Sequence, residues 1–174
     1  KAELKILNSV GDLLDPTQKA EANKAEANKV TQKIEKLNRN ITKNDENEIL
    51  ESRNAYNSLN DEAKSLVKNL DILERAERKS KVINLIDKIG RDDNKNDTVE
   101  NRVNKYIEDV KKAKEAYDTL SEEEKNTISP LDREFLNGAL VTVEQLNTEA
   151  RDKAIAEKLV ERISKLKSYE KYTQ

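Results

Sequence analysis

The chemically capable side chains of this sequence are carboxylates, amides and hydroxyls, and the densest group lies at residues 92–98. Oxygen-bearing side chains stand there at alternate positions: Asp92, Asn94, Asn96 and Thr98. This spacing is that of the first ligands in a calcium-binding loop. The match then ends, because Asp97 replaces the required glycine and Val103 replaces the closing glutamate. We therefore prefer a solvated, helix-capping loop, with calcium binding as the alternative.

Other catalytic chemistry is poorly supplied. The chain has no histidine and no cysteine, so the commonest general base, the thiol nucleophile and the usual transition-metal ligands are missing. Paired carboxylates can hydrolyse glycosides, but that reaction needs a cleft with sugar-binding surfaces, and the chain has no tryptophan. We expect no enzyme activity, no catalytic residues and no cofactor.

The composition favours narrow seams between helices over a thick globule. Of 174 residues, 34% are hydrophobic and 39% are charged. Disorder is the rival interpretation, but the apolar residues are periodic, which favours folded helices. The formal charge of −2 gives nucleic acid no strong attraction. Residues 92–124 carry a net charge of −5, and residues 151–174 carry a net charge of +3. Ordinary charged helix faces explain these values, and the alternative is that the charges steer neighbouring copies or anionic wall polymers.

The chain contains an internal repeat. AYNSLNDEAK at 55–64 returns as AYDTLSEEEK at 116–125, and LLDPTQK at 13–19 is a more divergent copy. Each copy offers a helix N-cap at the same place, namely Asp15, Asn60 or Ser121. Pro130 cannot lie deep in a helix, so a short turn at 122–128 and a new helix from Pro130 are predicted. Three copies of one helix-turn-helix junction indicate an array of repeated units.

The helix after each turn carries two apolar stripes. At about 100° per residue, Val82, Ile86 and Ile89 lie nearly opposite Leu70–Leu73. The same holds for Leu159, Ile163 and Leu166 against Leu136, Leu140 and Val143, and for Val30, Ile34 and Leu37 against Ala22 and Ala25. Such a helix packs into one bundle with its first half and into the next bundle with its second half.

These patterns predict an all-α fold of elongated tandem three-helix bundles, a spectrin-like rod with long helices shared between neighbours. The polar segments 41–48 and 90–97 are the expected loops at bundle ends, with Asp45 and Asp97 as caps. The predicted domains are a partial first repeat at 1–40, a three-helix repeat at 29–80, a longer one at 81–157, and the start of another at 158–174. A coiled-coil oligomer of separate chains is an alternative architecture.

Two pairs of segments resemble the tandem helical repeats of surface-layer and wall-associated proteins of Gram-positive bacteria. The first pair is KVTQKIEKL at 29–37 with ESRNAYNSLNDEAKSLVKNLDILERAE at 51–77, and the second is KVINLIDKI at 81–89 with VKKAKEAYDTLSEEEKNTIS at 110–129. The third copy departs from the pattern through its long helix at 98–120 and through Ser129-Pro130. The resemblance implies a spacer or interaction segment of an exported protein and brings no catalytic residues.

We therefore expect a non-enzymatic structural spacer or assembly module at the bacterial cell surface or wall, with neighbouring copies or a wall polymer as partners. The alternative is a module that binds wall polysaccharide or a host protein along its helix faces. No apolar run is long enough to span a membrane, and no signal peptide is visible. Because Lys1 begins in mid-pattern, we expect the chain to be a fragment of a longer protein.

Overall fold

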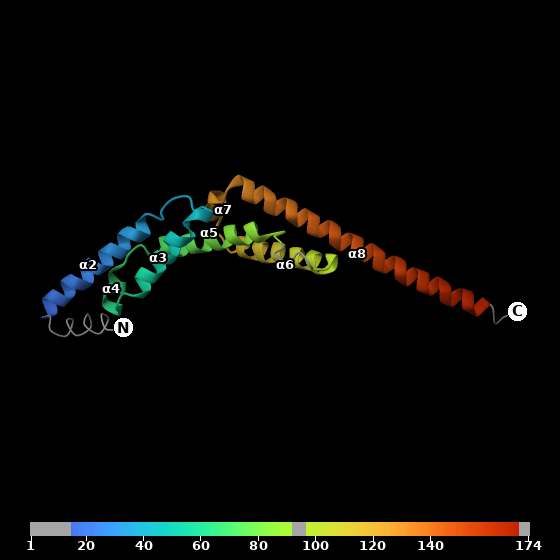
Figure 1. Cartoon of the computed structure of the whole chain (residues 1–174), viewed down its shortest axis with the longest axis horizontal. Helices are drawn as coiled ribbons and strands as arrows, with labels where there is room; N and C mark the ends of the chain where they lie inside the picture. Colours follow the sequence, from blue (N-terminus) through green and yellow to red (C-terminus); the bar gives the residue numbers. More distant parts are fainter. Residues whose placement is uncertain (1–14, 92–96, 171–174) are drawn as a thin grey trace. The chain divides into compact units, whose positions relative to one another are not determined.

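The computed structural model describes residues 15–91 and 97–170, with side chains as far as residue 161. In these ranges the regular secondary structure is entirely helical, which confirms the all-α prediction. The elements, shown in Figure 1, are α2 (Pro16–Glu35), η1 (Lys43–Asp45), α3 (Glu46–Asn57), α4 (Asp61–Leu66), α5 (Leu70–Lys88), α6 (Val99–Asp118), α7 (Glu122–Thr127) and α8 (Pro130–Glu170).

The chain divides into two compact units. One comprises the residues up to Asn84 together with Ala116–Ser129, and the other comprises Leu85–Glu115 and the residues from Pro130 onward. Helices α5 and α6 each cross a boundary, so both units contain part of each of them. The repeat boundaries predicted from the sequence stay predictions.

The repeated turns start their helices in one way. The side chains of Asp15, Asn60 and Ser121 each accept a hydrogen bond from the backbone amide of the third helical residue, at 3.0, 2.8 and 3.2 Å. Gln18 and Glu124 return the bond to the cap amide, which completes a capping box at the first and third turns. All three predicted caps are confirmed. The predicted new helix from Pro130 is confirmed as α8, but the predicted turn at 122–128 is largely a six-residue helix, α7.

The two remaining predicted caps bond differently. Asp45 precedes α3 but makes no cap bond to it; its carboxylate accepts from the Thr42 amide at 2.7 Å and from Arg39 at 2.9 Å. Asp45 therefore stands at the predicted N-cap position of α3 but does not cap it with its side chain, because Arg39 and Thr42 take its oxygens. Asp97 accepts from the Thr98 amide at 3.0 Å and from the Asn101 side chain at 2.6 Å, at the start of α6.

Helix α5 is unbroken from Leu70 to Lys88 and is buried on two sides. Leu73 is 0% exposed and Val82 is 1% exposed, although nine residues separate them and place them about 180° apart around the helix. Ile86 and Ile89 are buried as well. The two predicted stripes of this helix are thus both covered.

Helices α2 and α8 differ from α5. In α2 one face is buried, through Ala27, Val30 and Ile34, whereas Ala22 and Ala25 are exposed. The prediction of a second buried stripe through these two alanines is wrong. A methyl group offers little apolar area to bury, so alanines at helical spacing are weak evidence for a buried face.

In α8, Leu136 and Ala139 are buried, but every described side chain from 147 to 161 is exposed. Helix α6 shows the reverse gradient: Val110, Ala113 and Ala116 are buried, and Val99 is 68% exposed. The apolar face of α6 is therefore covered in its second half and exposed at its start.

Candidate functional site

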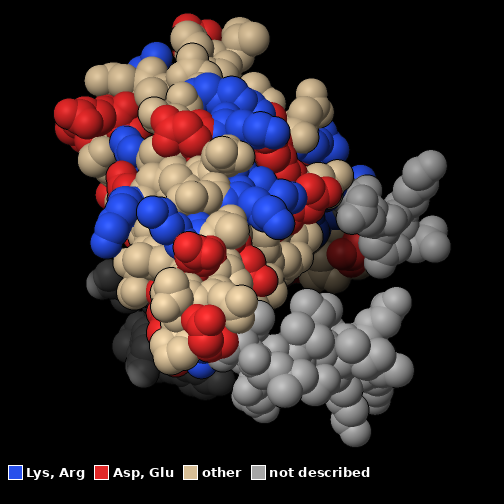
Figure 2. Space-filling view, turned by 90° about the vertical axis from the view of Figure 1, so that its left-hand side faces the viewer, with Lys and Arg blue, Asp and Glu red and all other residues tan. Residues whose placement is uncertain are grey.

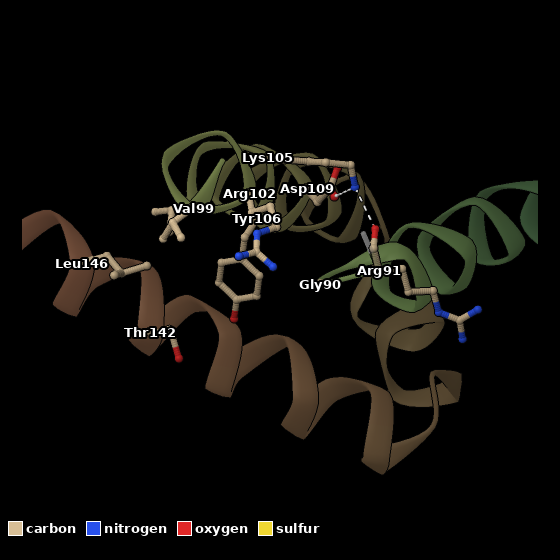
Figure 3. A pocket seen from close by; sticks show the side chains of 10 residues that line it. Gly90, Arg91, Val99, Arg102, Lys105, Tyr106, Asp109, Thr142 and Leu146 are labelled. Carbon is tan, nitrogen blue, oxygen red and sulfur yellow. Dashed lines mark hydrogen bonds and ion pairs between the residues drawn. The ribbon is translucent and has the colours of Figure 1, made fainter. Parts of the chain in front are cut away.

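The described part of the second unit contains an apolar cavity of about 420 Å³, bordered by the end of α5, the first half of α6 and the middle of α8. Its lining is Gly90, Arg91, Val99, Arg102, Val103, Lys105, Tyr106, Asp109, Thr142 and Leu146 (Figure 3). Because the exposed walls are largely apolar, the cavity suits an apolar or aromatic group better than a polar one.

Gly90 shapes one edge of this cavity. It lies two residues after Lys88, the last residue of α5, with φ at +74°, the left-handed conformation that ends many helices and that other residues adopt only with strain. A Cβ atom there would lie 3.8 Å from the Tyr106 ring, an ordinary contact. Figure 3 shows this ring pointing from α6 toward α8. The tyrosine therefore forms a wall between the two helices.

The charged edge is held by ion pairs. The Lys105 ammonium donates to the Asp109 carboxylate and to the Arg91 carbonyl, both at 3.0 Å. The Arg91 guanidinium in turn pairs with Asp87 one helical turn earlier. These contacts fix the end of α5 to α6 within this unit. The Thr142 hydroxyl donates to the Gly138 carbonyl of its own helix at 3.0 Å and is not poised as a nucleophile.

A second polar cluster joins α5 to α7 in the first unit. The Glu124 carboxylate, only 8% exposed, accepts from the Arg78 guanidinium at 2.6 Å and from the Ser121 amide at 2.8 Å. Burial alone would raise the pKa of Glu124, but these hydrogen bonds and the Arg78 charge outweigh it and hold the pKa below its ordinary value. Burial, aided by Arg75, lowers the pKa of nearby Lys79. Glu124 thus caps one helix and ties it to another.

The repeated tyrosines have similar surroundings. Tyr56 and Tyr117 are half-buried, and each has a cation over its ring. The Arg53 guanidinium lies 5.6 Å from the Tyr56 centroid, and the Lys125 ammonium lies 5.7 Å from that of Tyr117. The two cations occupy different places in the repeat, since Arg53 precedes Tyr56 in α3 whereas Lys125 follows Tyr117 across the turn, in α7.

The calcium-loop prediction is left untested for most of its residues, since Asp92, Asn94 and Asn96 lie outside the described ranges. Thr98 is described, and its hydroxyl accepts from the Asn101 amide at 3.2 Å, a capping role in α6. Among the residues that the structure does describe, no group of acidic, histidine or cysteine side chains is arranged to hold a metal ion.

The sequence analysis missed the cavity. Gly90 and Tyr106 lie 16 positions apart on either side of a polar loop, and neither spacing nor composition joins them. The available signal was Gly90 itself, which stands just after an apolar stripe, where a left-handed helix end is common.

The face drawn in Figure 2 carries Lys and Arg interspersed with Asp and Glu, without a patch of one sign. None of the helices in 15–91 and 97–170 combines the length and apolar character of a membrane-spanning segment. Comparison of the chain with protein-family models, with curated proteins and with solved structures finds no match.

Proposed function

We propose that this chain is a non-enzymatic structural module, a spacer or assembly segment of a bacterial cell-surface protein of the surface-layer or wall-associated type. The observation that carries the proposal is the burial of α5 at Leu73 in the first unit and, about 140° around the same helix, at Ile86 in the second. A helix packed on both sides along its length joins successive helical groups without a flexible linker. Tandem three-helix bundles that share such helices form a stiff rod, which holds attached parts at a distance.

The internal repeat supports the same role. The three turns reuse one N-cap hydrogen bond, so the chain repeats one structural device. The surface location comes from the resemblance of these repeats to those of wall-associated proteins. A spacer also needs no reactive site, which agrees with a sequence free of histidine and cysteine.

Small-angle scattering of the purified chain tests the rod. A compact domain of 174 residues has a radius of gyration of about 16 Å, whereas α8 alone, with 41 residues, is about 60 Å long. We expect a radius above about 20 Å, independent of concentration. A value near the compact figure refutes the spacer, and a mass that rises with concentration favours the coiled-coil oligomer. Antibody labelling of intact cells tests the location, since an unlabelled surface contradicts it.

A binding module is the second candidate, and the apolar cavity beside Tyr106 favours it. The test is a pull-down on purified wall glycans and serum proteins. Saturable capture that Tyr106→Ala abolishes supports binding. The matched control is Phe135→Ala, which removes an exposed aromatic ring of α8 away from the cavity. If neither substitution alters the capture, the captured ligand does not bind in the cavity.

A further inference from the structure

A small cavity of about 190 Å³ lies in the first unit, between the residues that follow α2, the first half of α5 and helix α7. It has room for about six water molecules at about 30 Å³ each, which is enough for a small ion. Its lining includes three basic side chains and two acidic ones, from Arg39, Arg75, Lys79, Glu123 and Glu124. The cavity is thus of a size and a composition that suit a charged ligand.

Lys79 is the side chain that sets this cavity apart. It is only 9% exposed, and no hydrogen bond or ion pair joins its ammonium to another residue of 15–91 and 97–161. A buried ammonium without a partner is costly, because it loses water and gains no opposite charge. The ammonium is not sealed from solvent, since the described side-chain atoms that are both sealed and unpaired belong to Asn69 and Arg133. A small ion in the cavity can therefore reach it.

The internal repeat shows that the fold needs no charge at this position. When KVTQKIEKL is aligned with KVINLIDKI, Ala27 of α2 stands where Lys79 stands in α5, two residues before each segment. The repeated turn likewise places Ala63 where Glu124 stands. Ala27 is 1% exposed and Ala63 is 0% exposed, on two helices that pack together. Small apolar side chains thus close this junction in the first copy, so packing does not explain the buried lysine in the second.

Neither carboxylate of the lining forms an ion pair with Lys79. Both oxygens of Glu124 already have donors, because one accepts from the Arg78 guanidinium at 2.6 Å and the other from the Ser121 amide at 2.8 Å. Glu123 is exposed, and solvent screens its charge. The charge of Lys79 therefore lacks an anion at close range.

Arg75 can add a second positive charge to the same anion. It lies one helical turn before Lys79 on α5 and lines the same cavity. Its pair with Asp71, at 3.1 Å, joins side chains that are 44% and 69% exposed, and such surface pairs contribute little. Arg75 can therefore turn toward an anion at small cost. Two neighbouring cations match a phosphate group, which carries a charge of about −1.5 to −2 at pH 7.

We propose that this cavity binds a phosphate group, with Lys79 and Arg75 as the side chains that hold it. Lysine contributes a compact point charge, and arginine contributes a planar fork of donors. The group belongs either to inorganic phosphate or to a phosphate ester of a larger molecule, since the two share this chemistry. The site goes beyond the spacer role and does not depend on it.

Calorimetric titration of the intact chain with inorganic phosphate at low ionic strength tests the site. We expect saturable binding that weakens as salt is added, because salt screens the charges. Lys79→Met keeps an unbranched side chain but removes the ammonium, so it should weaken binding at least about tenfold. Arg75→Gln should weaken binding as well. A parallel titration with glycerol phosphate identifies the source: tighter binding than that of inorganic phosphate supports an ester, and weaker binding supports the free ion.

Lys81→Met is the matched control. Lys81 lies two residues later on α5, is exposed and does not line the cavity, and its substitution makes the same change in net charge. This variant should bind phosphate as the parent chain does. Circular dichroism checks that each variant is folded. Lys79→Ala is a second variant at the site, because alanine is accommodated at the corresponding position Ala27 of the first copy.

Three outcomes overturn the inference. The first is no saturable binding up to about 10 mM phosphate. The second is equal binding by Lys79→Met and the parent chain, which means that phosphate binds elsewhere. The third is binding of acetate as tight as that of phosphate, which means that a single negative charge suffices and removes the argument for phosphate. None of these outcomes alters the radius of gyration expected for a rod, so the spacer proposal is tested separately.

Discussion

Truncating Leu73 tests whether α5 holds both units together. Leu73 is 0% exposed in the first unit, and Ile86, 2% exposed on the same helix, belongs to the second. Replacing a buried Leu or Ile by Ala costs about 2–5 kcal/mol through lost burial and the cavity left behind. The two sites lie 13 residues, or about 20 Å, apart along the helix, so their costs should add within about 0.5 kcal/mol. Leu73→Ala with Ile86→Ala should then cost about 4–10 kcal/mol, much of the whole stability of a typical domain.

The assay is urea unfolding followed by helical circular dichroism. Each single substitution should move one common transition to lower urea, and the pair should move it further or abolish it. Leu50→Ala is the control, because Leu50 is 57% exposed on α3 and its loss should change stability by less than about 0.5 kcal/mol. A cost below about 1 kcal/mol for Leu73→Ala refutes the burial argument. Two separate transitions, each sensitive to only one substitution, refute the shared helix.

Three further predictions follow from local contacts. The hydrogen bond from Arg39 holds the pKa of Asp45 at about 2, below its ordinary 3.8. Asp45→Asn should therefore lower the free energy of unfolding by about 1 kcal/mol at neutral pH. In urea melts at different pH values, the difference in stability between this variant and the parent chain should vanish as the pH falls from about 4 to 2. Gly90→Ala should lower stability by about 1–2 kcal/mol, because Gly90 has a left-handed φ. Gly138→Ala should raise stability by about 0.5–1 kcal/mol, because Gly138 lies in mid-helix with nothing within 4 Å of the added carbon. Thermal melts in which both substitutions shift the melting temperature in the same direction contradict this reasoning. Calorimetric titration with calcium should give no heat and no melting shift, and a saturable signal lost in Asp92→Asn would restore the calcium loop.

The sequence predicts the local features of this fold well. Asp15, Asn60 and Ser121 cap their helices as predicted because capping depends on a few neighbouring residues. The continuity of α5 and its two buried stripes follow from helical periodicity, which large apolar side chains define clearly.

The errors and omissions depend on longer-range packing. Ala22 and Ala25 follow the helical spacing, yet their small side chains do not decide which face is buried. Asp45 has the residue type of a cap, but Arg39 and Thr42, six and three residues earlier, take its oxygens. The cavity needs the distance between α6 and α8, which no local pattern contains.

The two six-residue helices have a consequence of their own. An isolated helix needs about 12–15 residues to persist in water, so α4 and α7 hold their form only through what surrounds them. Each should melt before the long helices when neighbours shift under load or mild heating. These short helices would then be the first to unfold and the first to refold, while the longer helices stay intact.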